Sequence, residues 1–143
     1  MAAKKKAAKK KAAAPKKKST TKARLKNKAS AQPVVHWEIQ AKNPVKVQKF
    51  YAELFAWKIS AEDPTNYGMV ASKAGSLGID GGIGASAGTS KVTFYVQVEN
   101  IPATLAKCER LGGKTIMPRT DLGMVTMAMF QDVEGNQIGL VEA

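Results

Sequence analysis

Cysteine and histidine are scarce: the 143-residue chain has one of each, Cys108 and His36. A single cysteine excludes an intrachain disulfide and any zinc site that needs several cysteine ligands. We therefore expect a reducing compartment such as the cytoplasm. A single histidine likewise excludes a site built on two histidines and a carboxylate.

Long apolar runs are also missing. No segment has the unbroken apolar length of a membrane helix, and the N-terminal residues lack the apolar stretch of a secretory signal, so we expect no membrane partner. Acidic residues are absent from residues 1–32, which hold twelve lysines and one arginine. The rest of the chain has ten basic and eleven acidic residues, so the net charge of +12 comes from this first segment.

Residues 1–32 form a low-complexity Lys/Ala-rich tail that cannot bury enough apolar surface to offset chain entropy, and we predict that it is disordered when free. Its composition resembles the tails of linker histones, which implies association with DNA, RNA or another polyanion, and with a nucleoid or chromatin. A purely solubilising role is the simpler alternative. The predicted nucleic-acid-binding residues are Lys4, Lys5, Lys6, Lys9, Lys10, Lys11, Lys16, Lys17, Lys18, Lys22, Arg24, Lys26 and Lys28.

Regular periodicity begins after the tail. In the stretch VVHWEIQ, Val35, Trp37 and Ile39 alternate with polar residues, which predicts a strand that is buried on one face. Asn43 and Pro44 then predict the start of a helix. The apolar residues of this helix recur at helical spacing and predict a buried stripe: Val47, Phe50, Tyr51, Leu54 and Phe55.

The same order of elements then repeats. Strands are predicted near 57–60, 67–72 and 79–83 in the first copy, and the second copy has strands near 91–98, 114–118, 124–130 and 136–142 and a helix over 102–111. A shift of 57 residues superposes the copies without a gap and places Asn43 on Asn100 and Gly78 on Gly135. We predict an α+β domain over residues 33–143, made of two tandem βαβββ modules, 33–90 and 91–143.

Two stretches resemble a known superfamily. HWEIQAKNPVKVQKFYAELFAWKI resembles the opening of a vicinal oxygen chelate module, and DVEGNQIGLVE resembles its closing motif. This superfamily contains glyoxalase I, bleomycin-resistance proteins and extradiol dioxygenases. The resemblance implies an open, barrel-like curved sheet with helices outside, against the apolar sides of the first strands, and a ligand cavity on the concave face. It also implies a homodimer.

The resemblance further implies where a metal ion would bind, because metal-using members take four ligands from the first and last strands of the two modules. Those positions here are His36, Gly82, Thr93 and Gly139. Glycine has no donor and a threonine hydroxyl is a poor ligand for transition metals, so we expect no metal and no cofactor. The glycines either permit the sheet to curve or leave room for a ligand ring near the backbone.

Alternation along the predicted strands gives a polar cavity suited to a small polar or aromatic molecule. Its predicted ligand-binding residues are His36, Glu38, Gln40, Asp80, Gly82, Thr93, Tyr95, Gln97, Gln137 and Gly139. His36, Glu38 and Asp80 are also candidates for acid/base catalysis or for a displaced metal site. In the simpler interpretation, His36 is a hydrogen-bonded residue retained from a metal-binding ancestor.

Three functions remain open from the sequence. The first is a metal-independent small-molecule-binding protein whose tail associates with nucleic acid. The second is a glyoxalase-like lyase or isomerase that uses a nonstandard metal site or His36. In the third, the tail is the main functional element and the folded domain is its cargo.

Overall fold

The computed structural model describes residues 31–72 and 77–143. The chain divides into two units, Met1–Ser30 and Ala31–Ala143, and the second unit contains the fold described below. All thirteen predicted nucleic-acid-binding residues of the tail lie outside the described residues. Within the described part, no helix is both long and apolar enough to cross a membrane.

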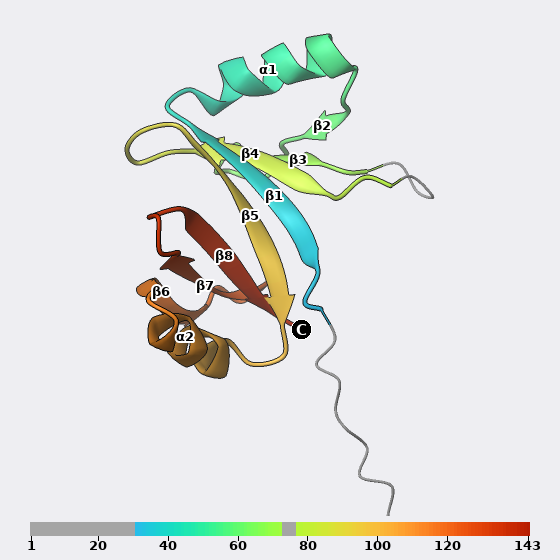
Figure 1. Cartoon of the computed structure of the whole chain (residues 1–143). Helices are drawn as coiled ribbons and strands as arrows, with labels where there is room; N and C mark the ends of the chain where they lie inside the picture. The colour runs from blue at the N-terminus through green and yellow to red at the C-terminus, as the bar shows by residue number, and fades with distance from the viewer. Residues whose placement is uncertain (1–30, 73–76) are drawn as a thin grey trace, which may run out of the picture. The chain divides into compact units, whose positions relative to one another are not determined.

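Two βαβββ modules follow one another along the chain (Figure 1). The first contains β1 (Val34–Ala41), α1 (Pro44–Phe55), β2 (Ile59–Ser60), β3 (Gly68–Val70) and β4 (Gly81–Ala85). The second contains β5 (Lys91–Val98), α2 (Ile101–Arg110), β6 (Lys114–Asp121), β7 (Thr126–Gln131) and β8 (Gln137–Glu142). The predicted α+β architecture is confirmed, and β5 starts and ends 57 residues after β1.

All eight strands belong to one open, curved sheet with the order β2-β3-β4-β1-β5-β8-β7-β6 (Figure 1). The first strands of the two modules, β1 and β5, pair antiparallel in its middle. The last strand of each module runs parallel to its own first strand, β4 beside β1 and β8 beside β5. This order places the strands that carry the predicted site residues side by side at the centre of the sheet.

Both helices begin as their capping residues predict. The side chain of Asn43 accepts a hydrogen bond from the backbone N–H of Lys46 at 3.0 Å, and Asn100 accepts one from Ala103 at 2.8 Å. A proline lies in the first turn of each helix, where its missing N–H leaves no hydrogen bond unmade. The repeated Asn-containing start therefore has the same structural role in both modules.

The two modules bury their helices differently. In the second module Val98, Ile101, Leu105, Ala128 and Leu140 form a buried cluster, in which α2 packs on the sheet. In α1 only Gln48 is buried. Its side-chain amide donates hydrogen bonds to the backbone carbonyls of Asn66 at 2.8 Å and of Ile83 at 2.9 Å. Because Ile83 is in β4, this amide connects α1 to the sheet.

The buried stripe predicted for α1 is wrong in part. Phe50, Leu54 and Phe55 are each more than half exposed, because the aromatic rings of α1 stack on one another and on Trp57 instead of on the sheet. The expectation that the apolar side of β5 meets a helix holds only in part. Val96 and Val98 pack in the cluster with α2, whereas Val92 is 73% and Phe94 41% exposed. The helix α2 packs on β6, β7 and β8, farther from the centre of the sheet.

Candidate functional site

The register of β1 against β5 brings the predicted polar residues together on one face. His36 lies opposite Tyr95, Glu38 opposite Thr93 and Gln40 opposite Lys91. Because side chains alternate between the faces of a strand, all six point to the same side. On β8, Gly139 is the register partner of Tyr95, which extends this polar face into the second module.

A buried carboxylate lies at the centre of the face. Glu38 is 9% exposed, and one of its oxygens accepts hydrogen bonds from the Tyr95 hydroxyl at 2.5 Å and from the Gln40 amide at 3.1 Å. Burial, followed by the hydrogen bond to Glu38, raises the pKa of Tyr95 above its ordinary value, so the phenol keeps its proton and donates it. A buried carboxylate needs such donors to offset the loss of water.

His36 forms the second polar pair of the face. Its Nε2 lies 3.0 Å from the hydroxyl of Tyr67. Burial lowers the pKa of His36 below 6.5, while the charges of Glu38 and Asp80 act in the opposite direction. The imidazole is therefore neutral at pH 7, and burial raises the pKa of Tyr67, so that its hydroxyl stays protonated as well.

Sequence reasoning missed Tyr67, which lies one residue before β3 in an irregular segment. The available signal was the pair of glycines on the neighbouring strand, Gly82 and Gly84. A Cβ atom at either position would overlap the ring of Tyr67. Two glycines separated by one residue on a central strand point to the same face and indicate that another group covers the backbone there.

The glycines at the expected metal-ligand positions are covered by tyrosine rings. A Cβ at Gly82 would overlap the ring of Tyr67, and a Cβ at Gly139 would overlap the ring of Tyr95. One of the two interpretations of these glycines was room for a ligand ring near the backbone, and in the structure the rings of the chain's own tyrosines lie there. At both positions an aromatic ring fills the space that a longer side chain would need.

Asp80 lies just before β4, beside the row of His36. Its carboxylate accepts hydrogen bonds from the backbone N–H and the hydroxyl of Ser72, both at 2.7 Å. These bonds lower the pKa of Asp80, and the carboxylate stays charged near neutral pH. Asp80 therefore acts on His36 as a nearby negative charge.

The remaining predicted residues lie on the same face, toward the second module. Lys91 donates a hydrogen bond to the side-chain oxygen of Gln137 at 2.8 Å, and Gln97 lies two residues beyond Tyr95 along β5. Thr93 is 3% exposed, and its hydroxyl has no hydrogen-bond partner within residues 31–72 and 77–143. An unmade hydrogen bond at a buried hydroxyl is uncommon in folded proteins.

The described residues do not fit a transition-metal ion. No group of three or more His, Cys, Asp or Glu side chains within them is arranged to hold a metal. The displaced set proposed from the sequence is not assembled, because Glu38 points to Tyr95, Asp80 is bonded to Ser72 and His36 pairs with Tyr67.

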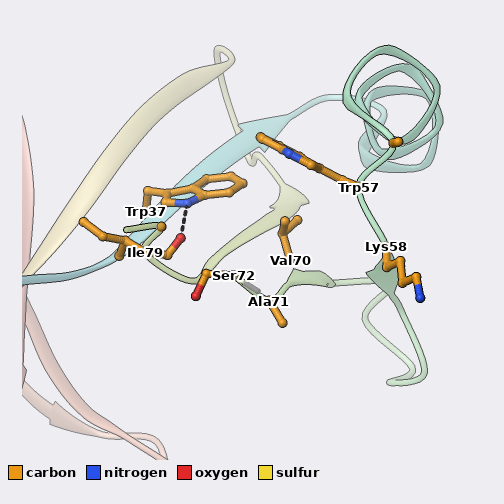
Figure 2. A pocket seen from close by; sticks show the side chains of 9 residues that line it. Trp37, Trp57, Lys58, Val70, Ala71, Ser72 and Ile79 are labelled. Carbon is orange, nitrogen blue, oxygen red and sulfur yellow. Dashed lines mark hydrogen bonds between the residues drawn. The ribbon is translucent and has the colours of Figure 1, made fainter. Parts of the chain in front are cut away.

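A cavity of about 740 Å³ lies on the other face of β1 (Figure 2). Trp37, which alternates with His36 and Glu38 and so points away from them, is on its wall together with Trp57, Val70 and Ile79. The alternation in VVHWEIQ predicts that Trp37 lies on the buried face of the strand. The structure shows a half-buried indole beside an open space.

Comparison with known proteins agrees with the fold. No protein-family model matches the sequence. Solved structures with the same fold include a glyoxalase/bleomycin resistance protein/dioxygenase superfamily member from Vibrio splendidus 12B01, with 15% identity, a TM-score of 0.58 and coverage of 79% of this chain and 100% of that chain. Another is methylmalonyl-CoA epimerase from Mycobacterium tuberculosis, with 14% identity, a TM-score of 0.54 and coverage of 76% of this chain and 86% of that chain.

The chain therefore shares its two-module fold with these structures. A glyoxylase-like domain-containing protein from Didymella fabae is 33% identical over 110 residues, which cover 69% of this chain and 84% of the relative. The chain belongs to this glyoxalase-like family.

Proposed function

We propose that the chain is a small-molecule-binding protein of the glyoxalase/bleomycin-resistance type that binds its ligand on the concave face without a metal ion. The observation that carries this proposal is the pair of tyrosine rings over Gly82 and Gly139. Each ring occupies the space of an expected metal ligand, and each hydroxyl is held by a polar residue of β1. The centre of this face therefore consists of side-chain hydroxyl, imidazole and carboxylate groups that hydrogen-bond to one another.

The chemistry of the face favours a ligand with an apolar or aromatic body and a few hydrogen-bonding groups. Half-buried methionines of β7 lie on it, since Met129 is the register partner of Gly139 and Met127 that of Val141. Methionine side chains adapt to irregular apolar shapes. The half-buried, neutral imidazole of His36 provides a polar contact near the centre.

A thermal-shift panel of phenols and aromatic carboxylic acids tests the proposal with full-length protein purified without a metal-charged resin. We expect compounds that raise the melting temperature equally with and without EDTA. The His36→Gln variant should reduce these shifts, whereas Leu122→Ser, which changes an exposed residue of the β6–β7 turn, should leave them unchanged.

The metal content of the same protein preparation provides a second test of the proposal. Elemental analysis that finds one Zn, Ni, Mn or Fe per chain, lost on His36→Ala, would contradict metal-independent binding. So would a ligand shift that disappears with EDTA and returns with added metal ion.

A lyase or isomerase is the second candidate, and the lowered pKa of His36 favours it. A neutral imidazole is able to take a proton from a carbon next to a carbonyl group and to return it, which leaves the oxidation state of the substrate unchanged. The Tyr67 hydroxyl at 3.0 Å orients the imidazole for such a role. Incorporation of solvent deuterium into a bound ligand, lost in His36→Gln, would distinguish this activity from binding alone.

The basic tail supports a proposed association with nucleic acid or another polyanion. Its thirteen positive charges lie in residues 1–32, and the rest of the chain has a charge of −1. Lysine acts on phosphates as a point charge, without the geometry that reads bases, so this binding is independent of sequence.

A further inference from the structure

The cavity on the helix side of β1 is separate from the polar face. Trp37 and Trp57 form one part of its wall and Val70 and Ile79 another, and its volume is about 740 Å³. Figure 2 shows Val70 pointing toward the two indole rings. We call this cavity the tryptophan pocket. Its size falls within the range of small-molecule sites and far exceeds an ordinary packing defect.

The indole of Trp37 has a fixed position in the tryptophan pocket. Its Nε1–H donates a hydrogen bond to the backbone carbonyl of Ile79 at 2.9 Å (Figure 2). A Cβ at Gly81, its register partner on β4, would overlap the ring, so the indole lies directly on the glycine backbone. Its polar atom is satisfied, one face of the ring is covered, and the ring remains half-buried beside the open space.

Trp57 is held by neighbouring aromatic rings. It lies 5.3 Å from Trp37, 5.6 Å from Tyr51 and 5.1 Å from Phe55, measured between ring centroids. Ala56, just before it, has a φ of 54°, a left-handed conformation that ends α1 and turns the chain toward β2. The pocket therefore has two aromatic walls whose orientations are set by other contacts before any ligand binds.

The second module acts as an internal control, because it has the same fold with different residues at the equivalent positions. Shifting by 57 residues places Phe94 on Trp37, Lys114 on Trp57 and Ile138 on Gly81. Both modules form the same strands and helix. The second module thus forms the same elements without the two tryptophans and without the glycine beneath Trp37.

We propose that the tryptophan pocket is a second ligand site, distinct from the concave face, for a flat, uncharged aromatic molecule. Indole faces bind aromatic rings by stacking and burial of apolar area. Among the described residues that line the pocket, Lys58 is the charged one, and Figure 2 shows its ammonium group pointing away from the indole rings. The hydroxyl of Ser72 donates to Asp80, so the polar edge of the pocket is already occupied by an internal hydrogen bond.

Fluorescence tests the proposal directly, because Trp37 and Trp57 are the two tryptophans of the chain. The probe is N-phenyl-1-naphthylamine, a neutral aromatic dye, titrated into full-length protein. We expect saturable binding of one dye per chain, quenching of the tryptophan emission and enhancement of the dye emission. His36→Gln, a change on the opposite face, should leave the affinity for the dye unchanged.

Two variants and one control locate the binding. Trp57→Leu keeps an apolar wall but removes one stacking partner and should weaken dye binding by roughly three- to tenfold. Gly81→Ala should also weaken it, by displacing the indole of Trp37. Leu122→Ser, which removes a 58% exposed apolar side chain outside the pocket wall, should have no effect.

Circular dichroism establishes which variants fold. If Gly81→Ala does not fold, Trp57→Leu decides, because leucine keeps an apolar side chain next to Tyr51 and Phe55. Unchanged affinity in folded Trp57→Leu would overturn the proposal. An equal loss in Leu122→Ser would also overturn it, because this would show general adsorption of the dye to exposed apolar surface.

Discussion

Removing one hydroxyl from the centre of the concave face should destabilise the domain measurably. Tyr95 is 7% exposed and Glu38 is 9% exposed, and the hydroxyl of the tyrosine donates to the carboxylate at 2.5 Å. In Tyr95→Phe the ring still covers Gly139. Of the two hydrogen bonds that Glu38 Oε2 accepts, from Tyr95 and from Gln40, the second remains. The change therefore isolates the hydrogen bond from the packing of the ring.

The magnitude follows from the burial of both partners. A hydrogen bond to a charged group is worth about 1.5–3 kcal/mol. For a domain of this size, about 4 °C of melting temperature corresponds to 1 kcal/mol, which gives a decrease of about 6–12 °C. Urea unfolding followed by circular dichroism measures the free energy, and calorimetry measures the melting temperature.

Tyr67→Phe is the matched control, because its hydroxyl pairs with the neutral, half-buried His36 and should cost only about 0.5–1.5 kcal/mol. The double variant Tyr95→Phe with Glu38→Gln should lose less than the sum of the two single changes, as expected for residues in contact. Two results would refute the hydrogen bond between Tyr95 and the buried carboxylate of Glu38. One is a decrease in the free energy of unfolding below about 0.5 kcal/mol in folded Tyr95→Phe, and the other is a larger decrease in Tyr67→Phe than in Tyr95→Phe.

Three other predictions follow from the structure and the sequence. Because burial lowers the pKa of His36, the unfolded chain takes up the proton first, and the free energy of unfolding should fall as the pH drops below 6.5. His36→Gln should remove this loss, and NMR titration of the imidazole should report the lowered pKa. Gly139→Ala should lower the free energy of unfolding by about 1–3 kcal/mol, because the added methyl group overlaps the Tyr95 ring. Gly88→Ala is the control and should be tolerated, since nothing lies within 4 Å of the added atom; equal effects would contradict the position of the ring. Duplex DNA affinity should fall with log salt at a slope on the order of −6 to −12, and deletion of residues 1–32 should abolish binding in gel shifts; sequence-selective binding by the truncated chain would contradict this.

The sequence was sufficient to predict the arrangement of the modules. Alternation in VVHWEIQ, the asparagine caps and the constant 57-residue offset are local signals, and each one corresponds to an observed strand, helix start or repeat. The offset also predicts which strands are equivalent. With that information, the polar residues of β1 and β5 are placed on one face by their alternation alone.

The parts that the sequence did not predict depend on contacts across the fold. The sequence predicts a strand near 67–72, but β3 begins at Gly68 and Tyr67 precedes it in an irregular segment. The position of Tyr67 over Gly82 therefore follows from tertiary structure. The apolar spacing of α1 correctly predicts a helix, but spacing does not specify what an apolar face touches. In this chain, Phe50 and Phe55 lie among other aromatic rings and remain exposed.

The bond between Glu38 and Tyr95 joins equivalent positions of the two modules, since the residues are 57 apart and flank the directly paired Trp37 and Phe94. In an association of two identical modules the same positions would bring glutamate against glutamate or tyrosine against tyrosine. The first combination is repulsive, and the second lacks the buried acceptor. The two halves have therefore become complementary parts, and each should select the other over a copy of itself when they are produced as separate chains.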